Sequence, residues 1–189
     1  MQHADVIVIG AGIVGAACAH VLARQGLDVL VLDARLGGAT AAGMGHLVVL
    51  DDNPAELALS QASVALWHAW GPRMTADQPG CAYSNCGTLW LAANDAEMAG
   101  AEEKARRMRD HGLACEMLDA TALRRAEPSL HPDLVGALKV PGDGIVYAPN
   151  AAQWLLQQAP HKIRFEQAEA THIDGGRVPL ADSSWREAK

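Results

Sequence analysis

Three glycines and one acidic residue have the types and the spacing of a nucleotide-binding site. The glycines lie in Gly10-Ala11-Gly12-Ile13-Val14-Gly15, and Asp33 follows 18 positions after the last of them. Gly10 allows a tight turn out of a strand, Gly12 lets the backbone approach a pyrophosphate, and Gly15 allows a helix to pack closely on a sheet. The helix N-terminus after such a turn offers N–H groups and a partial positive charge to phosphates. Asp33 can accept hydrogen bonds from ribose hydroxyls and disfavours the 2′-phosphate of NADP, so the pattern predicts a site for FAD or NAD.

The elements that must position these residues surround them in the sequence. Residues 5–9 form a short β-branched run that is typical of a strand buried on both faces. Residues 16–25 are helical in character, with Gly26 as the stop, and residues 27–32 form a second apolar strand that ends at Asp33. The order strand, glycine turn, helix, strand and acid predicts a dinucleotide-binding unit more specifically than the glycines alone.

The next segment favours FAD over NAD. Residues 37–45 contain only Gly, Ala, Thr and Met. A loop with so little side-chain bulk would let a large planar ligand lie against its backbone. The alternative interpretation of this segment is a flexible linker, which its lack of Ser and charge disfavours.

Several segments resemble the D-amino-acid-oxidase-like superfamily of FAD-dependent amine and amino-acid oxidoreductases. The resemblance rests on residues 5–15, 33–34, 40–44, 87–91, 118–120, 127–128 and 141–144. The stretch from Gly38 to Leu59 is most similar to the D-hydroxyproline dehydrogenase group of that superfamily. The resemblance thus covers nearly the whole chain, and it is more specific for the superfamily than for the substrate.

The resemblance implies an extended FAD and assigns each of its parts to residues of this chain. The residues implied at the pyrophosphate and the adenosine ribose are Gly10, Gly12, Ile13, Val14, Gly15, Asp33 and Ala34. The residues implied at the ribityl chain and the isoalloxazine are Thr40, Ala41, Ala42, Gly43, Met44 and Gly45, and the backbone of Ala170 is implied at the adenine. Thr40 stands where some relatives carry a flavin-linking His, so non-covalent FAD is expected. His46 either contacts the flavin or merely begins the next segment, and the second interpretation is favoured.

The expected fold class is α/β, with an incomplete Rossmann-like FAD-binding domain and an incomplete inserted α+β substrate domain that contains a mixed sheet. The expected boundaries are 1–50 for the FAD-binding unit, 51–160 for the partial substrate domain and 161–189 for the return to the first domain. Beyond the first unit, helices are predicted at 53–70, 95–109, 120–127 and 151–158, the last capped by Asn150. Strands are predicted at 87–92, 115–118, 136–140, 144–147 and 163–166, with a hairpin at 173–178.

The activity implied by the resemblance is oxidation of the C–N bond of a small or cyclic amino acid, or of an amine, by hydride transfer to flavin. Family enzymes are longer, and their later half supplies the Arg that binds the substrate carboxylate and the active-site Tyr. We therefore expect an N-terminal portion of such an enzyme, name no catalytic residue and expect no turnover by this chain alone. A non-catalytic nucleotide-binding fragment and an NAD-dependent protein are the alternatives. The electron acceptor, oxygen or a respiratory carrier, and the oligomeric state are left open.

Composition excludes other classes of function. The formal net charge of −7 argues against a nucleic-acid partner, because phosphate affinity comes from clustered Lys and Arg. Four cysteines are too few for a disulfide scaffold and lack the spacing of a metal site, so reduced thiols and no metal are expected. The uncharged run at 6–23 is interrupted by glycines and preceded by Asp5, which argues against a transmembrane segment or a signal peptide. A cytoplasmic location is therefore expected.

Overall fold

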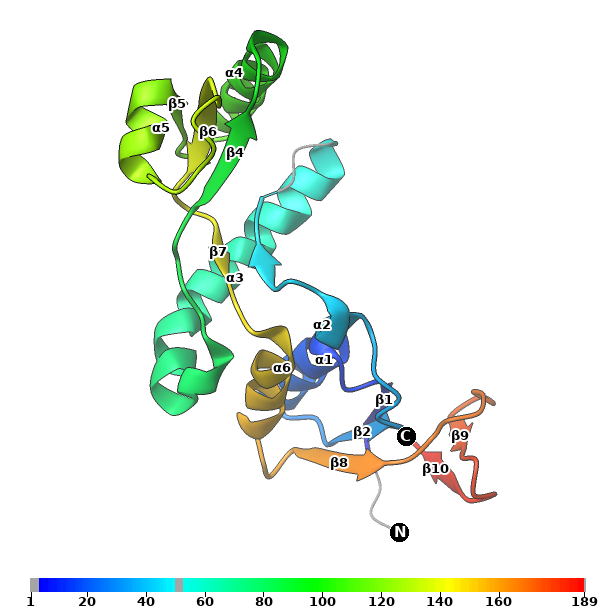
Figure 1. Cartoon of the computed structure of the whole chain (residues 1–189). Helices are drawn as coiled ribbons and strands as arrows, with labels where there is room; N and C mark the ends of the chain where they lie inside the picture. The colour runs from blue at the N-terminus through cyan, green and yellow to red at the C-terminus, as the bar shows by residue number, and fades with distance from the viewer. Residues whose placement is uncertain (1–3, 50–52, 189) are drawn as a thin grey trace. The chain divides into compact units, whose positions relative to one another are not determined.

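The computed structural model describes residues 4–49 and 53–188, and the chain divides into two compact units. Unit 1 comprises residues 1–45, 74–81 and 147–189, and unit 2 comprises residues 46–73 and 82–146. The chain therefore passes between the units several times, as the colour sequence along the ribbon in Figure 1 shows. The expected domain boundaries of 1–50, 51–160 and 161–189 stay a prediction. Residues 147–160 belong to unit 1, together with residues 1–45.

Unit 1 is built on a parallel sheet of three strands in the order β1-β2-β8. The strands are β1 (Val6–Ile9), β2 (Val29–Asp33) and β8 (Ile163–Gln167). In the register, Val31 of β2 lies opposite both Val8 and Phe165, and Asp33 lies opposite Gln167. The three predicted strands are confirmed to within two residues at their ends.

Two helices, α1 (Ile13–Arg24) and α6 (Ala148–Gln157), pack against each other and supply one side of the core of this unit. The residues of that core are Ala19, Ala23, Val29, Val31 and Ile163, with Leu156 of α6 packed against them. Since side chains alternate along a strand, Leu30 and Leu32 of β2 enter a second cluster with Val178 and Leu180. Both faces of β2 are thus buried, as its apolar run predicts.

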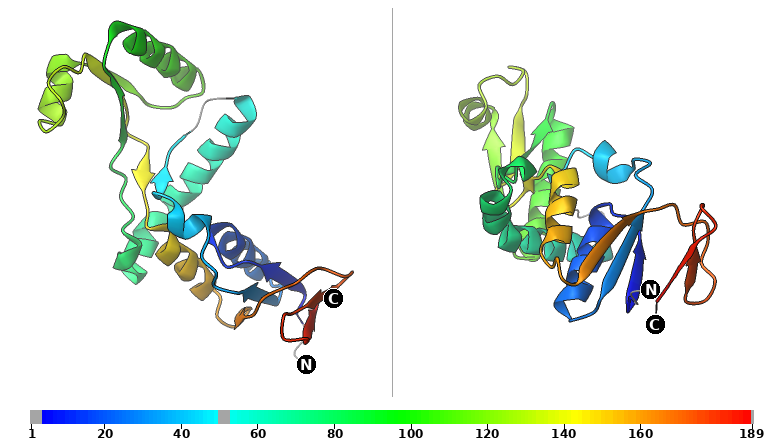
Figure 2. Two further views of the ribbon diagram at one scale, coloured as in Figure 1. Left: turned by 45° about the vertical axis from the view of Figure 1, so that its right-hand side comes forward. Right: turned by 90° about the horizontal axis from the view of Figure 1, so that it is seen from below.

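The C-terminal part of unit 1 is a hairpin of β9 (Arg177–Pro179) and β10 (Trp185–Glu187). The hairpin predicted at 173–178 is present only as a tight turn, in which Asp174 and Arg177 exchange two backbone hydrogen bonds of 2.9 Å around Gly175-Gly176. The paired strands β9 and β10 are joined by the later turn at 180–184. Arg186 of β10 forms an ion pair with Glu166 of β8 and so ties the hairpin to the sheet. Figure 2 shows the hairpin in red, following the orange segment of the chain that contains β8.

The segment predicted as a loop at 37–45 contains a helical turn, α2 (Ala39–Ala42). Gly43 N donates to Ala39 O over 2.8 Å, and Ala42 N donates to Gly38 O over 3.2 Å. Alanine has the highest helix propensity, so a run rich in Ala closes a turn where its glycine-rich flanks stay extended. The prediction of a loop without secondary structure is therefore wrong at these four residues.

The helix α3 (Pro54–Asp77) begins as predicted and ends later than predicted. Asn53 Oδ1 accepts the Glu56 N–H over 2.9 Å, which is the expected cap. The helix was expected to end before Gly71-Pro72, and that prediction is wrong. A proline costs a helix one backbone hydrogen bond but does not exclude continuation where packing supports the next turn. Here Met74, in the turn after Pro72, is fully buried.

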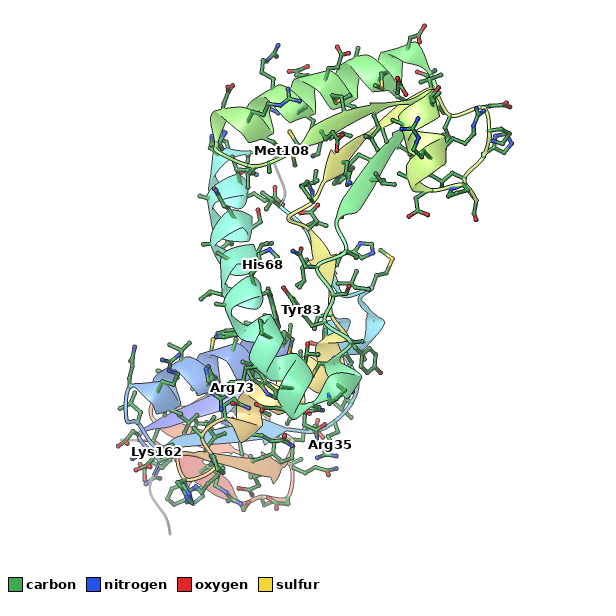
Figure 3. All side chains as sticks on the ribbon, turned by 90° about the vertical axis from the view of Figure 1, so that its left-hand side faces the viewer. Arg35, His68, Arg73, Tyr83, Met108 and Lys162 are labelled. Carbon is green, nitrogen blue, oxygen red and sulfur yellow. The ribbon has the colours of Figure 1, made fainter. Side chains whose placement is uncertain are left out.

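Unit 2 contains an antiparallel sheet in the order β4-β6-β5. Its strands are β4 (Thr88–Ala92), β5 (Glu116–Asp119) and β6 (Gly136–Val140). The helix α4 (Asp95–Asp110) packs on β6 through the buried residues Ala105, Met108, Leu138 and Val140, and Figure 3 labels Met108 on this helix. Asp119 caps α5 (Ala120–Ala126) by accepting the Ala122 N–H over 2.7 Å, as predicted. The pairings described in this unit are antiparallel, and the parallel strands lie in unit 1.

The remaining elements are a short two-stranded ribbon, a 3-10 turn and the first turn of α6. β3 (His46–Leu47) pairs with β7 (Gly144–Ile145), so the strand predicted at 144–147 is shorter than expected. The short 3-10 turn η1 (Pro79–Cys81) precedes Ala82. Asn150 was expected to cap α6, and this is wrong, because the helix begins at Ala148 with Tyr147 at the cap position. Asn150 Nδ2 instead donates to Gly80 O over 2.7 Å.

The β6–β7 turn carries a fully buried carboxylate, Asp143. Its Oδ1 accepts the Val49 N–H over 3.2 Å. Burial raises the pKa of Asp143, and the Val49 N–H, the Thr88 hydroxyl and the charges of Lys104 and His68 oppose that rise. A folded-state pKa above the unfolded value means that this carboxyl stabilises the fold below the unfolded pKa and loses that contribution as the pH rises through the folded pKa.

We therefore expect Asp143→Asn to be at least as stable as the parent chain at pH 7 and to flatten the pH dependence of unfolding between pH 4 and 7. The amide keeps an acceptor for the Val49 N–H and removes the cost of a buried charge. Asp143→Ala is expected to lose about 1–3 kcal/mol, because it leaves that N–H without its acceptor. Urea unfolding of the three chains across this pH range measures both effects. A parent chain that gains stability relative to Asp143→Asn as the pH rises would contradict the expected direction.

Candidate dinucleotide-binding site

The turn between β1 and α1 depends on glycine at three positions for three separate reasons. Gly10 has a φ of 99°, which residues with a side chain rarely adopt. Its N–H donates to Leu32 O over 2.7 Å. A Cβ on Gly15 would overlap the carbonyl oxygen of Gly10 and lie 3.3 Å from Val8 Cγ1. Gly15 is thus required for the close approach of α1 to the turn, as the sequence predicts.

Gly12 is the N-cap of α1, and it contacts a residue far along the chain. A Cβ on Gly12 would lie 2.9 Å from Thr40 Oγ1. The same hydroxyl accepts the N–H of Ile13 over 2.9 Å. This contact explains why the helix begins at Ile13 and not at Ala16, because Thr40 supplies an acceptor to its first turn. The sequence does not reveal a cap that comes from 27 residues away.

Asp33 stands at the carboxyl end of β2 and faces the glycine turn. Its Oδ2 accepts the Ala11 N–H over 2.7 Å, and its Oδ1 accepts the Arg35 N–H over 2.6 Å. A carboxylate has about four acceptor sites, so two of them remain for further donors. The side chain is half-buried, fixed in direction and still able to accept hydrogen bonds from a ligand.

A cavity of about 850 Å³ opens beside this turn within unit 1. Five of the predicted site residues line it: Gly10, Gly12, Asp33, Thr40 and Ala41. The remainder of its wall comes from Ala11, Arg35, Gly37, Gly38 and Ala39, from α6 through Pro149, Ala152, Gln153, Leu156 and Gln157, and from β8 through Ile163 and Phe165. The volume lies within the range of small-molecule and cofactor sites. One wall is mostly backbone, and the wall from α6 and β8 combines apolar side chains with the two glutamines.

The other predicted site residues do not line this cavity. They are Ile13, Val14, Gly15, Ala34, Ala42, Gly43, Met44, Gly45 and Ala170. Val14 and Met44 are 75% and 81% exposed, so both side chains are open to contact. Ala170 pairs with Leu180 and packs against the cluster that contains Leu30 and Leu32. His46 begins β3, where it pairs with Ile145.

Sequence reasoning missed the parts of the wall that tertiary packing supplies. Gln153 and Gln157 are four residues apart on α6, and Phe165 lies on β8, more than 100 residues after the glycine turn. Arg35 directly follows the predicted Ala34, and its guanidinium carbon lies 5.0 Å from the centroid of the Phe165 ring. The position of Arg35, two residues after Asp33, could have indicated from the sequence that it lines the cavity. Nothing in the local sequence placed Phe165 beside it.

Two further observations limit the chemistry of the described residues. Within residues 4–49 and 53–188, no group of three or more His, Cys, Asp or Glu side chains is placed to hold a metal ion. In the same ranges, no helix combines the length and the apolar character that a membrane span needs.

Comparison with known proteins decides the family. The model of the family DAO, FAD dependent oxidoreductase, matches residues 5–188. The chain belongs to the DAO family. Gamma-glutamylputrescine oxidoreductase of Escherichia coli K12 is 30% identical in an alignment that covers 92% of this chain and 41% of that protein. Anaerobic glycerol-3-phosphate dehydrogenase subunit A1 of Haloferax volcanii is also 30% identical, over 92% of this chain and 30% of that protein.

Solved structures show the same DAO-family fold. Glycine oxidase from Geobacillus kaustophilus superposes with a TM-score of 0.88 at 24% identity, over 100% of this chain and 54% of that chain. L-proline dehydrogenase from P. horikoshii gives a TM-score of 0.85 at 22% identity, over 99% of this chain and 51% of that chain. The expected fold class is thereby confirmed. The chain spans about half the length of these solved relatives and less than half the length of the curated ones.

Proposed function

We propose that unit 1 binds the adenosine diphosphate part of FAD without a covalent link, and that the whole protein oxidises the C–N bond of a small or cyclic amino acid or of an amine. The observation that carries the proposal is the position of Asp33. Its carboxylate is held against the glycine turn through the Ala11 N–H at 2.7 Å, on the wall of the cavity that the turn opens. The fit to a dinucleotide is geometric: open backbone for phosphates lies beside an acceptor for ribose hydroxyls.

In this proposal, different residues of unit 1 contact different parts of the cofactor. The first turn of α1, with Gly12, Ile13 and Val14, supplies N–H groups and the positive end of the helix dipole to the pyrophosphate. Gly10 and Gly15 shape that turn, and Asp33 with Ala34 holds the ribose. The segment proposed for the ribityl chain and the flavin ring is Thr40, Ala41, Ala42, Gly43, Met44 and Gly45, and the backbone of Ala170 is proposed near the adenine. Thr40 uses its hydroxyl as the acceptor for Ile13 N–H, which accords with non-covalent binding.

A bound flavin supplies a hydride acceptor, and the protein supplies binding, orientation and exclusion of water. The substrate class is supported by relatives whose names include glycine oxidase, L-proline dehydrogenase and gamma-glutamylputrescine oxidoreductase. Similarity of residues 38–59 to the D-hydroxyproline dehydrogenase group makes that cyclic amino acid the first substrate to test. The second candidate is oxidation of a C–O bond in a polyol phosphate, since two glycerol-3-phosphate dehydrogenase subunits match at 28–30% identity.

Titration of the purified chain with FAD, FMN and NAD tests the cofactor assignment. We expect quenching of FAD fluorescence with a micromolar dissociation constant or tighter, and release of the flavin into the supernatant after acid precipitation. Binding of NAD without binding of FAD would contradict the proposal. For the whole protein, dye reduction with D-hydroxyproline, glycine, L-proline and glycerol 3-phosphate separates the amino-acid candidates from the polyol phosphate.

A further inference from the structure

The helix α3 has one covered face and one exposed face. On the covered face, Leu57 and Val64 are buried in a cluster with Val49. His68 lies on the same side, where its Nδ1 is 2.8 Å from the Tyr83 hydroxyl oxygen, and Figure 3 labels both residues. Six residues on the opposite side are all exposed and are spaced alternately by four and three positions. We call them the outer face of α3: Ala55, Leu59, Ala62, Leu66, Ala69 and Arg73.

The outer face of α3 is apolar and carries no charge over most of its length. Leu59 and Leu66 are 74% and 53% exposed, with alanines between and beside them. No Asp, Glu, Lys or Arg occurs from residue 57 to residue 72. The exposed side of a surface helix ordinarily carries charged and polar residues, so an exposed apolar side of this kind marks an interaction surface.

The spacing of the outer face is the heptad spacing of helices that pair side by side. Two copies of α3 can pair antiparallel about a two-fold axis at Val64, so that residues equally far before and after that position lie opposite each other. Leu59 then packs on Ala69 of the second copy, and Leu66 packs on Ala62 of the second copy. Every leucine meets an alanine, and one patch serves both copies, as a two-fold symmetric interface requires.

The charges at the two ends of the outer face fit the same arrangement. Glu56 precedes the uncharged stretch and Arg73 follows it. The antiparallel pair places Arg73 opposite Ala55 of the second copy and therefore beside Glu56 of that copy. A parallel pair would instead bring Glu56 against Glu56 and Arg73 against Arg73. Charge complementarity thus selects the antiparallel orientation, in which the two helix dipoles also oppose each other.

We propose that a second copy of this chain covers the outer face of α3, through an antiparallel helix pair with its two-fold axis at Val64. The proposal is independent of the cofactor assignment, because none of these residues lines the dinucleotide cavity. A helix segment from 55 to 73 is about 27 Å long and about 10 Å wide. A contact of that size is at the small end of specific interfaces, so a reversible dimer with a micromolar dissociation constant is expected.

Sedimentation equilibrium of the full chain over a range of concentrations measures the dimer. Leu66→Glu and Ala62→Lys are each expected to weaken dimerisation at least about tenfold, since each buries two like charges beside apolar side chains. Both positions are exposed in the single chain, so the urea midpoint is expected to stay unchanged at a concentration at which the parent chain is monomeric. Ala99→Lys, at an exposed position of α4, is the matched control for added charge and is expected to dimerise as the parent chain does.

Mixing the two single variants tests the register of the helix pair. The carboxylate introduced at position 66 of one chain then lies opposite the ammonium introduced at position 62 of the other. The mixture is therefore expected to form a heterodimer at least about tenfold tighter than either variant forms with itself, whereas Leu66→Glu mixed with Ala99→Lys forms no such heterodimer. A parent chain that stays monomeric overturns the proposal and leaves the outer face to a different protein. Dimerisation of Leu66→Glu with the parent's affinity, or a mixture no tighter than the single variants, overturns it as well.

Discussion

Replacing Gly15 with alanine is expected to abolish FAD binding and to lower the free energy of unfolding by about 3 kcal/mol or more. The added Cβ would overlap the carbonyl oxygen of Gly10 and lie 3.0 Å from its carbonyl carbon. The obstructing group is backbone in a turn whose φ at Gly10 is 99°, so no rotation of a side chain can relieve the clash. The helix or the turn must move, and either movement displaces the N–H groups that face the cavity. Urea unfolding and FAD titration of Gly15→Ala measure the two losses.

Gly100→Ala is the matched control for this substitution. Gly100 lies in the interior of α4, and a Cβ there would meet no atom within 4 Å. Alanine is a better helix former than glycine, so this variant is expected to gain about 0.5–1 kcal/mol and to bind FAD as the parent chain does. A Gly15→Ala chain that unfolds at the parent's urea midpoint and still binds FAD would contradict the requirement for glycine at this position.

The first part of the fold could be predicted from the sequence because its contacts join residues of one short segment. The tasks of Gly10, Gly15 and Asp33 are carried out within one strand–turn–helix–strand unit, where spacing alone brings the groups together. The caps at Asn53 and Asp119 follow the same logic, because the acceptor and the N–H that it binds are three residues apart. Local rules of this kind need no knowledge of the tertiary structure.

The features that could not be predicted depend on contacts between distant segments. Thr40 accepts the N–H of Ile13 and moves the start of α1, and Asn150 binds Gly80 O in place of a cap. α3 continues through Pro72 into a turn whose Met74 is buried. The far wall of the cavity comes from α6 and β8, and only the pairing of β2 with β8 brings Phe165 near Arg35.

The second large effect is expected at Asp33. Asp33→Ala should weaken FAD binding about 100-fold, because hydrogen bonds to a charged acceptor contribute about 1.5–3 kcal/mol each and the ribose loses this acceptor. The variant should also unfold more easily, by about 1–3 kcal/mol, since the N–H groups of Ala11 and Arg35 lose their bonds of 2.7 and 2.6 Å. Asp33→Asn keeps the shape with a weaker neutral acceptor, so an intermediate loss of affinity is expected. Asp110→Ala, at the exposed end of α4, is the control and should change stability by no more than about 0.5 kcal/mol.

Because Asp33 supports both the turn and the proposed ribose contact, loss of affinity alone does not tell which role matters. Comparing the binding affinities for ADP and for 2′,3′-dideoxy-ADP separates the two roles. If Asp33 binds the ribose, the parent chain prefers ADP strongly, and Asp33→Ala binds the two ligands with nearly equal affinity because the acceptor for the hydroxyls is gone. If Asp33 acts only through the Ala11 and Arg35 N–H groups, the preference for ADP is the same in both chains and both affinities fall together. The second result would leave the glycine turn as a phosphate site and remove the residue on which the dinucleotide assignment depends.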